Sequence, residues 1–172
     1  MMREDTAWSL KLGRCRIDSV SEFLGDLRAL QERFGVRIVL MDAELMAGRI
    51  HARAALDQAL RAEEEQAMTA RSLEMEVLLY ASGQRQTGVA MKFGLHEGEM
   101  TAWVAVIPDS APVWEELESR ISIIPDEDEI PDRRIPVLKE LFGITDPELE
   151  AVGRRRIAEL VVERTALLNV LK

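Results

Sequence analysis

The chain of 172 residues contains only one cysteine, Cys15. A single cysteine cannot form an internal disulfide, which is typical of proteins in a reducing compartment. No uninterrupted apolar run approaches the roughly 20 residues that a bilayer-spanning helix needs. Arg3, Glu4 and Asp5 stand where an export signal would have its apolar core. We therefore expect a cytoplasmic protein that does not associate with membranes.

Histidine is also scarce, and His51 and His96 do not stand in a spacing typical of metal ligands. The sequence has no glycine-rich phosphate-binding loop and no Gly-x-Ser-x-Gly nucleophile motif. Acidic residues are plentiful, but most carboxylates in such a composition are solvated surface groups. The sequence therefore favours a protein that binds over one that catalyses, and it predicts no metal and no cofactor.

Negative charge is in excess, with 31 Asp and Glu against 22 Lys and Arg and a formal net charge of −9. This excess argues against a protein that coats nucleic acid through its overall charge. The charge is unevenly distributed, however. Acidic residues gather at 115–118 and 126–129, whereas the segment 49–92 contains the cations Arg49, Arg53, Arg61, Arg71, Arg85 and Lys92. A local contact with nucleic acid therefore stays open.

Hydropathy patterns predict strands and helices that alternate along the chain. Apolar runs predict strands at residues 6–12, 36–41, 100–107 and 122–124. Helical spacing and capping residues predict helices at residues 20–34, 50–65, 72–82, 112–120 and 136–142, and from residue 146 onward with an interruption at Gly153. We expect a mixed α/β (α+β) fold in which several helices cover a small central sheet, with one domain over residues 1–172. The charge and prolines near residues 125–133 predict a mobile acidic loop.

Residues 71–95 are the most informative stretch for function. Leu73, Val77 and Tyr80 share one helical face, and further apolar residues widen that face beyond what a surface helix needs. A polar corner at 82–86 follows this helix, and a second short helical pattern then runs to Gly94. This combination predicts a rigid segment that presents exposed hydrogen-bond donors.

The C-terminal segment, residues 159–171, has apolar residues around most of the helix circumference. One interpretation is an unusually well buried closing helix. The other is a helix that docks part of its surface on another protein. The sequence pattern alone leaves both open.

Several runs of residues resemble the Cgi-type subunit of the KEOPS/EKC complex, the TPRKB-like family of kinase-binding proteins, in its archaeal form. The most specific run is Leu78-Leu79-Tyr80-x-Ser82-Gly83-x-Arg85-Gln86. Weaker matches lie at residues 44–51, 59–62, 72–77, 92–94, 142–149 and 162–168. The resemblance covers nearly the whole chain.

The resemblance implies a non-catalytic accessory subunit of the machine that installs threonylcarbamoyl on the adenosine beside the tRNA anticodon. Members of this family bind the small atypical kinase/ATPase of the complex, and archaeal members also bind the 3′ CCA end of tRNA. The implied partners are thus this kinase and tRNA, with no membrane and no DNA. Single-stranded nucleotides bind through stacking and phosphate contacts, for which local arginine and lysine side chains are suited.

The resemblance also suggests site residues. The candidates for nucleic-acid binding are Arg61, Arg71, Met75, Leu79, Arg85, Gln86 and Lys92. The candidates for the kinase contact are Val161, Val162, Thr165 and Leu168. Burial in the core is the alternative role for Met75 and Leu79, and a solvated ion-pair ladder with Arg53 and Asp57 is the alternative for Arg61.

A function of another class also fits the sequence. Glu74 or Glu76 together with the corner around Arg85 would then form an anion site, in a small-molecule or anion-binding domain or a weak hydrolase. A deep polar pocket beside Arg85 would favour this alternative, and an open basic surface would favour nucleic acid.

Overall fold

The computed structural model describes residues 7–168, and these divide into two compact units. Unit 1 comprises residues 7–42 and 95–126, and unit 2 comprises residues 43–94 and 127–168. The expectation of a single domain stays a prediction. No helix within residues 7–168 is long and apolar enough to span a membrane.

Unit 1 is built on a four-stranded antiparallel sheet with the strand order β2-β3-β1-β4. Its elements are β1 (Ser9–Ile17), α1 (Val20–Phe34), β2 (Arg37–Asp42), β3 (Gly98–Ile107), α5 (Ala111–Leu117) and β4 (Ser122–Ile124). In the register of the sheet, Trp103 of β3 lies opposite Leu12 of β1 and Met41 of β2. The predicted mixed fold with a small sheet and several helices is confirmed.

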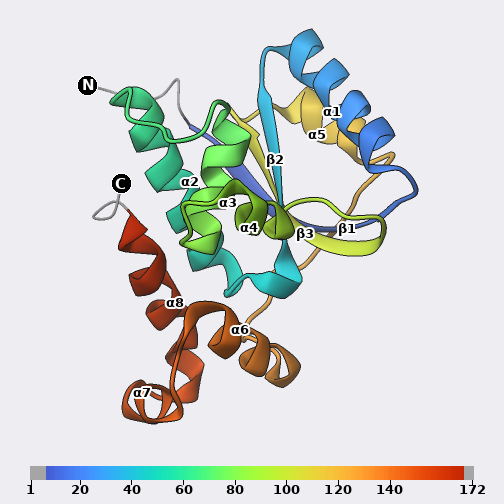
Figure 1. Ribbon diagram of the computed structural model, residues 1–172. Coiled ribbons are helices and arrows are strands. Elements are labelled where there is room, and N and C mark those ends of the chain that lie inside the picture. The colour runs from blue at the N-terminus through green and yellow to red at the C-terminus, as the bar shows by residue number, and fades with distance from the viewer. Residues whose placement is uncertain (1–6, 169–172) are drawn as a thin grey trace. The chain divides into compact units, whose positions relative to one another are not determined.

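One face of this sheet is covered by α1 and α5, which contact each other (Figure 1). Phe23 and Leu27 of α1 and Val113 of α5 share a buried cluster with Ile17 of β1. The helix limits follow from local chemistry, as the sequence predicted. The Ser19 hydroxyl accepts a hydrogen bond from the Glu22 backbone N–H at the start of α1, and a glycine in the left-handed conformation follows its end.

The first strand differs from the prediction, because it runs to Ile17 rather than ending near Leu12. Leu12 is buried on one face, whereas the buried side chains beyond Gly13 are Cys15 and Ile17, which point to the opposite face. A Cβ atom at Gly13 would lie only 2.4 Å from the Ile121 side chain. The strand therefore changes its buried face at a glycine that allows a close approach, and this change interrupts the alternation on which the sequence prediction relied.

All regular secondary-structure elements in the described residues of unit 2 are helices. Its elements are η2 (Ala43–Leu45), α2 (Gly48–Glu64), α3 (Leu73–Ser82), α4 (Thr87–Ala90), η3 (Met91–Phe93), η4 (Asp132–Arg134), α6 (Ile135–Phe142), α7 (Asp146–Val152), η5 (Arg154–Arg156) and α8 (Ile157–Ala166). The interruption predicted at Gly153 is present, because this glycine has a φ of 92° and separates α7 from α8. Thr145 and Glu148 form a capping box at the start of α7.

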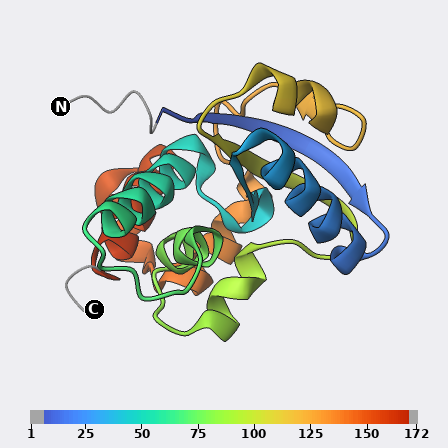
Figure 2. The same ribbon diagram turned by 90° about the horizontal axis from the view of Figure 1, so that it is seen from above.

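Helix α2 is the centre of unit 2, and both α3 and α8 pack against it (Figure 2). Ala52, Ala55 and Ala59 are completely buried along α2, and their small side chains allow a close approach of the neighbouring helices. The predicted burial of α3 on several sides is also confirmed, since Leu73, Val77, Tyr80 and other residues around its circumference are buried.

Ion pairs hold several residues of the acidic segment in unit 2. The guanidinium of Arg134 is buried and contacts both carboxylate oxygens of Glu127, at 2.9 and 2.7 Å. Arg155 pairs with Glu129 on the surface. The predicted mobility of this loop stays a prediction, but the loop is connected to its own unit by charge pairs.

Candidate functional site

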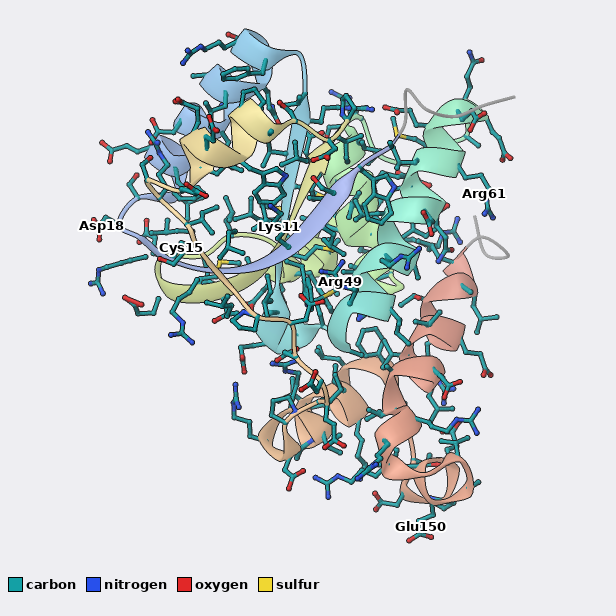
Figure 3. The ribbon with its side chains drawn as sticks, turned by 180° about the vertical axis from the view of Figure 1, so that it is seen from behind. Lys11, Cys15, Asp18, Arg49, Arg61 and Glu150 are labelled. Carbon is teal, nitrogen blue, oxygen red and sulfur yellow. The ribbon has the colours of Figure 1, made fainter. Side chains whose placement is uncertain are left out.

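The four candidate cations all belong to unit 2, and all four are exposed. Arg61 lies in the last turn of α2, and its side chain extends away from the helix (Figure 3). Arg71 directly precedes α3, Arg85 lies in the corner after α3, and Lys92 belongs to η3. Helix α3 has 10 residues, so it separates the Arg71 end from the Arg85 end by about 15 Å. A ligand that contacts both ends of α3 must therefore be elongated.

A buried carboxylate fixes the backbone beside Arg71. Glu76 is completely buried, and its oxygens accept hydrogen bonds from the backbone N–H groups of Thr69, at 3.0 and 3.2 Å, and Ala70, at 2.7 Å. Such charge-assisted bonds to a loop restrict its conformations. Glu76 is thus a support for the loop, and its carboxylate does not face the surface.

The corner that carries Arg85 is equally well defined. The Ser82 hydroxyl donates a hydrogen bond to the Leu79 carbonyl at 2.9 Å and accepts one from the Gln84 backbone N–H at 3.1 Å. Gly83 adopts the left-handed conformation, with a φ of 68°, and its N–H bonds back to α3. The predicted order of buried helix, polar corner and second short helix, formed by α4 and η3, is confirmed.

These cations have no acidic partner among the described residues, unlike most of the other cations in that part of the chain. Arg16, Arg120 and Arg154, for example, each pair with a carboxylate. Within residues 7–168, by contrast, the side chains of a smaller group of cations form no ion pair and no hydrogen bond with another described residue. They are Arg14, Arg28, Arg53, Arg61, Arg71, Arg85 and Lys92. The ion-pair ladder considered for Arg61 is therefore not formed, and its positive charge is available to a ligand.

The two apolar candidates for nucleic-acid contact, Met75 and Leu79, differ in how deeply they are buried. Leu79 is 1% exposed and belongs to the core, so its position does not support a contact with nucleotides. Met75 is half-buried and retains some surface, and Gln86 is exposed at the start of α4. Met91 belongs to the second short helical segment and is not among the candidate site residues, yet it is 59% exposed. Helical spacing places a residue on a face but does not reveal whether that face is covered.

The candidate kinase-binding residues lie mostly inside unit 2. Val161, Thr165 and Leu168 are buried, and the Thr165 hydroxyl donates a hydrogen bond to the Val162 carbonyl. The interpretation as a buried closing helix therefore describes three of the four. Val162 is half-buried and keeps accessible surface, as does the more exposed Leu167. Asn169, Val170 and Leu171 of the apolar segment lie outside the described residues.

A cavity of about 620 Å³ in unit 2 lies at the start of α2 rather than at Arg85. It is lined by Ala47, Gly48, Arg49, Ile50, Glu127, Asp128, Glu129, Ile130, Asp132, Ile135, Arg154, Arg155 and Ala158. Neither Glu74 nor Glu76 contributes to it, so it does not form the anion site considered for the Arg85 corner. Within residues 7–168 no group of three or more His, Cys, Asp or Glu side chains is arranged to hold a metal ion.

Comparison with known proteins identifies the family of this chain. The family model described as kinase binding protein CGI-121 matches residues 20–169, which is most of the chain. A search of curated protein sequences found no match to this chain. The match extends from α1 to the C-terminal helix and thus includes all the candidate site residues. The chain belongs to the CGI-121 family of kinase-binding proteins.

Proposed function

We propose that the protein is a non-catalytic accessory subunit of a KEOPS complex, the machine that forms threonylcarbamoyladenosine in tRNA. It would bind the small atypical kinase/ATPase of that complex and the single-stranded 3′ CCA end of tRNA. The family description supports the kinase part of this proposal. The observation that carries the tRNA part is the set of exposed cations at both ends of α3 that have no acidic partner among the described residues.

Binding of tRNA requires positive side chains that are not neutralised by carboxylates of the protein. The chain has a net charge of −9, so nucleic acid is repelled by the protein as a whole and needs a local attractive surface. Arg71 and Arg85 extend from backbone segments that hydrogen bonds hold in place. Cations on a fixed scaffold lose little conformational freedom when they bind a phosphate. A single strand that follows α3 can contact cations at both ends of this helix.

Binding measurements with the full chain test the tRNA part. We expect Arg85→Glu to weaken the affinity for tRNA at least about 5-fold, because a phosphate contact is replaced by a repulsion. Removal of the CCA end from tRNA should lower the affinity of the wild type and leave the affinity of Arg85→Glu nearly unchanged. Arg28→Glu is the matched control, because Arg28 is an exposed, unpaired arginine of unit 1 and the charge change is identical. Equal affinities of the two variants would disprove the proposed site.

For the kinase part, we place the contact at the accessible surface of α8. Val162 retains apolar surface on this helix, and Leu167 does so directly after it. Apolar surface on a helix is suited to docking in a partner's groove. The neighbouring positions Val161 and Thr165 are buried and would support this surface from below. The kinase would therefore contact fewer residues of this helix than the sequence suggested.

Co-purification with the kinase tests this contact. Val162→Arg should abolish co-purification while circular dichroism stays that of the wild type. Val137→Arg serves as the control, because Val137 is an exposed valine of α6 and receives the same substitution. An unfolded Val162→Arg protein would show that Val162 belongs to the core, and normal co-purification of a folded Val162→Arg protein would place the kinase elsewhere.

A further inference from the structure

Single-strand binding usually relies on aromatic side chains that stack on the bases. In the described part of unit 2 every aromatic ring is buried. Tyr80, Phe93 and Phe142 are all in the core, and His51 packs edge-on against Phe142. Any contact between this surface and the face of a base must therefore come from another kind of side chain.

Met91 is the exposed apolar side chain at the candidate nucleic-acid surface. It is the most exposed of the large hydrophobic residues within residues 7–168. It directly precedes Lys92 in η3, and its carbonyl accepts a hydrogen bond from the Gly94 N–H at 3.0 Å. The local backbone is therefore closed into a turn that holds the Met91 side chain outward.

The surroundings of Met91 add apolar surface from α3. Leu78 is half-buried, and one of its methyl groups lies 3.1 Å from the position of a Cβ atom on Gly94. Helix α3 also packs against α4 and η3, and Val89 of α4 is half-buried. Only Met91 among these three apolar side chains is exposed, and two exposed cations with no partner among residues 7–168, Arg85 and Lys92, stand on either side of Met91 in the chain. A protein partner would favour a wider apolar patch, whereas a base with its phosphates needs a small apolar contact next to cations.

We propose that the side chain of Met91 packs against the face of an unpaired RNA base whose neighbouring phosphates bind Arg85 and Lys92. This inference rests on the proposed tRNA-binding function and assigns to Met91 the apolar contact that was expected from Met75 and Leu79. Methionine is suited to this contact, because its thioether is polarizable and its flexible chain adapts to the ring that it meets. Base-paired RNA does not offer this face, so Met91 selects single-stranded ends and loops.

The test measures binding of the full chain to a short RNA oligonucleotide that ends in CCA and to the same oligonucleotide with abasic sites in place of the CCA bases. We expect Met91→Gln to weaken binding of the first probe about 3- to 10-fold, in the range of sulfur–aromatic contacts. Binding of the abasic probe should not change. Met91→Leu should retain most of the affinity, since leucine keeps the apolar surface. Ile50→Gln is the control for the loss of an exposed apolar side chain elsewhere in unit 2.

Salt dependence separates this contact from the phosphate contacts. Lys92→Gln should reduce the slope of log affinity against log salt by about 1, whereas Met91→Gln should leave the slope unchanged. If Arg85→Glu weakens binding but Met91→Gln does not, or if Met91→Gln weakens both probes equally, the role of Met91 is wrong and the proposed function stands. If the wild type binds neither probe, or if Arg85→Glu has no effect, the proposed function fails together with this inference.

Discussion

The imidazole of His51 connects α2 to α3 through the carbonyl of Ala81, with 2.8 Å between Nε2 and the carbonyl oxygen. The other ring nitrogen, Nδ1, accepts a hydrogen bond of 2.9 Å from the backbone N–H of Ala47. Because one partner is an acceptor and the other a donor, the neutral ring with its proton on Nε2 satisfies both. His51 is completely buried, and this burial lowers its pKa to about 4.

The pH dependence of stability follows from this pKa. The unfolded chain has a histidine pKa of about 6.5 and therefore takes up a proton at a higher pH than the folded chain does. The contribution of neutral His51 is fully present above pH 6.5 and is lost as the pH falls to about 4. We expect the free energy of unfolding to fall by about 3 kcal/mol over this window from His51 alone. Urea unfolding at a series of pH values measures it.

One variant isolates this effect from the titration of carboxylates. His51→Gln should be less stable at neutral pH but should lose about 3 kcal/mol less than the wild type between pH 7 and pH 4. If the free energy of unfolding changed with pH in the same way in His51→Gln and in the wild type, the attribution of this pH dependence to His51 would be wrong.

Gly83 has the backbone conformation that ends α3, and alanine should not be tolerated there. Its φ is 68°, and a Cβ atom would lie 3.4 Å from the Cα of Thr165 in α8. We expect Gly83→Ala to lower the free energy of unfolding by about 1–2 kcal/mol. Gly25→Ala is the matched control, because Gly25 lies within α1 with open space around it. This control should gain about 0.5–1 kcal/mol. A Gly83→Ala protein as stable as the wild type would refute the conformational argument.

The buried guanidinium of Arg134 makes the charge of Glu127 important for stability. Arg134 is 1% exposed, and its Nε has no hydrogen-bond partner within the described residues. We expect Glu127→Gln to cost about 3 kcal/mol, because it leaves a buried charge poorly compensated. Adding Arg134→Met to this variant should restore most of the loss, since the charge is then removed as well. Chemical unfolding of both proteins measures the difference.

The exposed pair of Arg155 and Glu129 provides the comparison. Both side chains are largely in solvent, so Glu129→Gln should change the free energy of unfolding by less than about 0.5 kcal/mol. Equal costs for Glu127→Gln and Glu129→Gln would mean that the burial of Arg134 does not determine the strength of its pair.

Glu76 supports the loop before α3, and its removal should loosen that loop. Glu76→Gln replaces a charged acceptor of backbone N–H groups by a neutral one, which should lower stability by about 1–2 kcal/mol. Hydrogen exchange should show faster exchange of the amide protons of Thr69 and Ala70, whose bonds to the carboxylate are weakened. Glu74→Gln on the same helix is the control and should leave both amides protected. Unchanged exchange in Glu76→Gln would show that the carboxylate does not hold the loop.

Local chemistry made several elements predictable. Both α1 and α3 begin after a serine cap and end at a glycine. These signals can be read from the sequence because they act through hydrogen bonds and backbone angles within a few residues. The buried strands β2 and β3 were predictable from continuous apolar runs. The change of face in β1 was not, since it depends on the contact of Gly13 with Ile121, which is distant in sequence.

The burial of each candidate site residue was harder to predict than the helix to which it belongs. The C-terminal segment is apolar around most of its circumference, so its sequence could not distinguish the buried Val161 and Thr165 from the partly exposed Val162. The same holds for α3, where Leu79 is in the core and Met75 is not. Which side of an apolar helix is covered depends on the neighbours that pack against it.

The sequence by itself determined the family, the order of strands and helices, and the residue types available for binding, because these depend on motifs, periodicity and composition. Only the tertiary structure decided which cations remain unpaired and which apolar side chains reach the surface. An ion pair such as that of Arg134 with Glu44 joins residues far apart in the chain, and Arg85 and Lys92 have no such partner within residues 7–168. Pairing and burial depend on distances in space, which the order of residues does not specify.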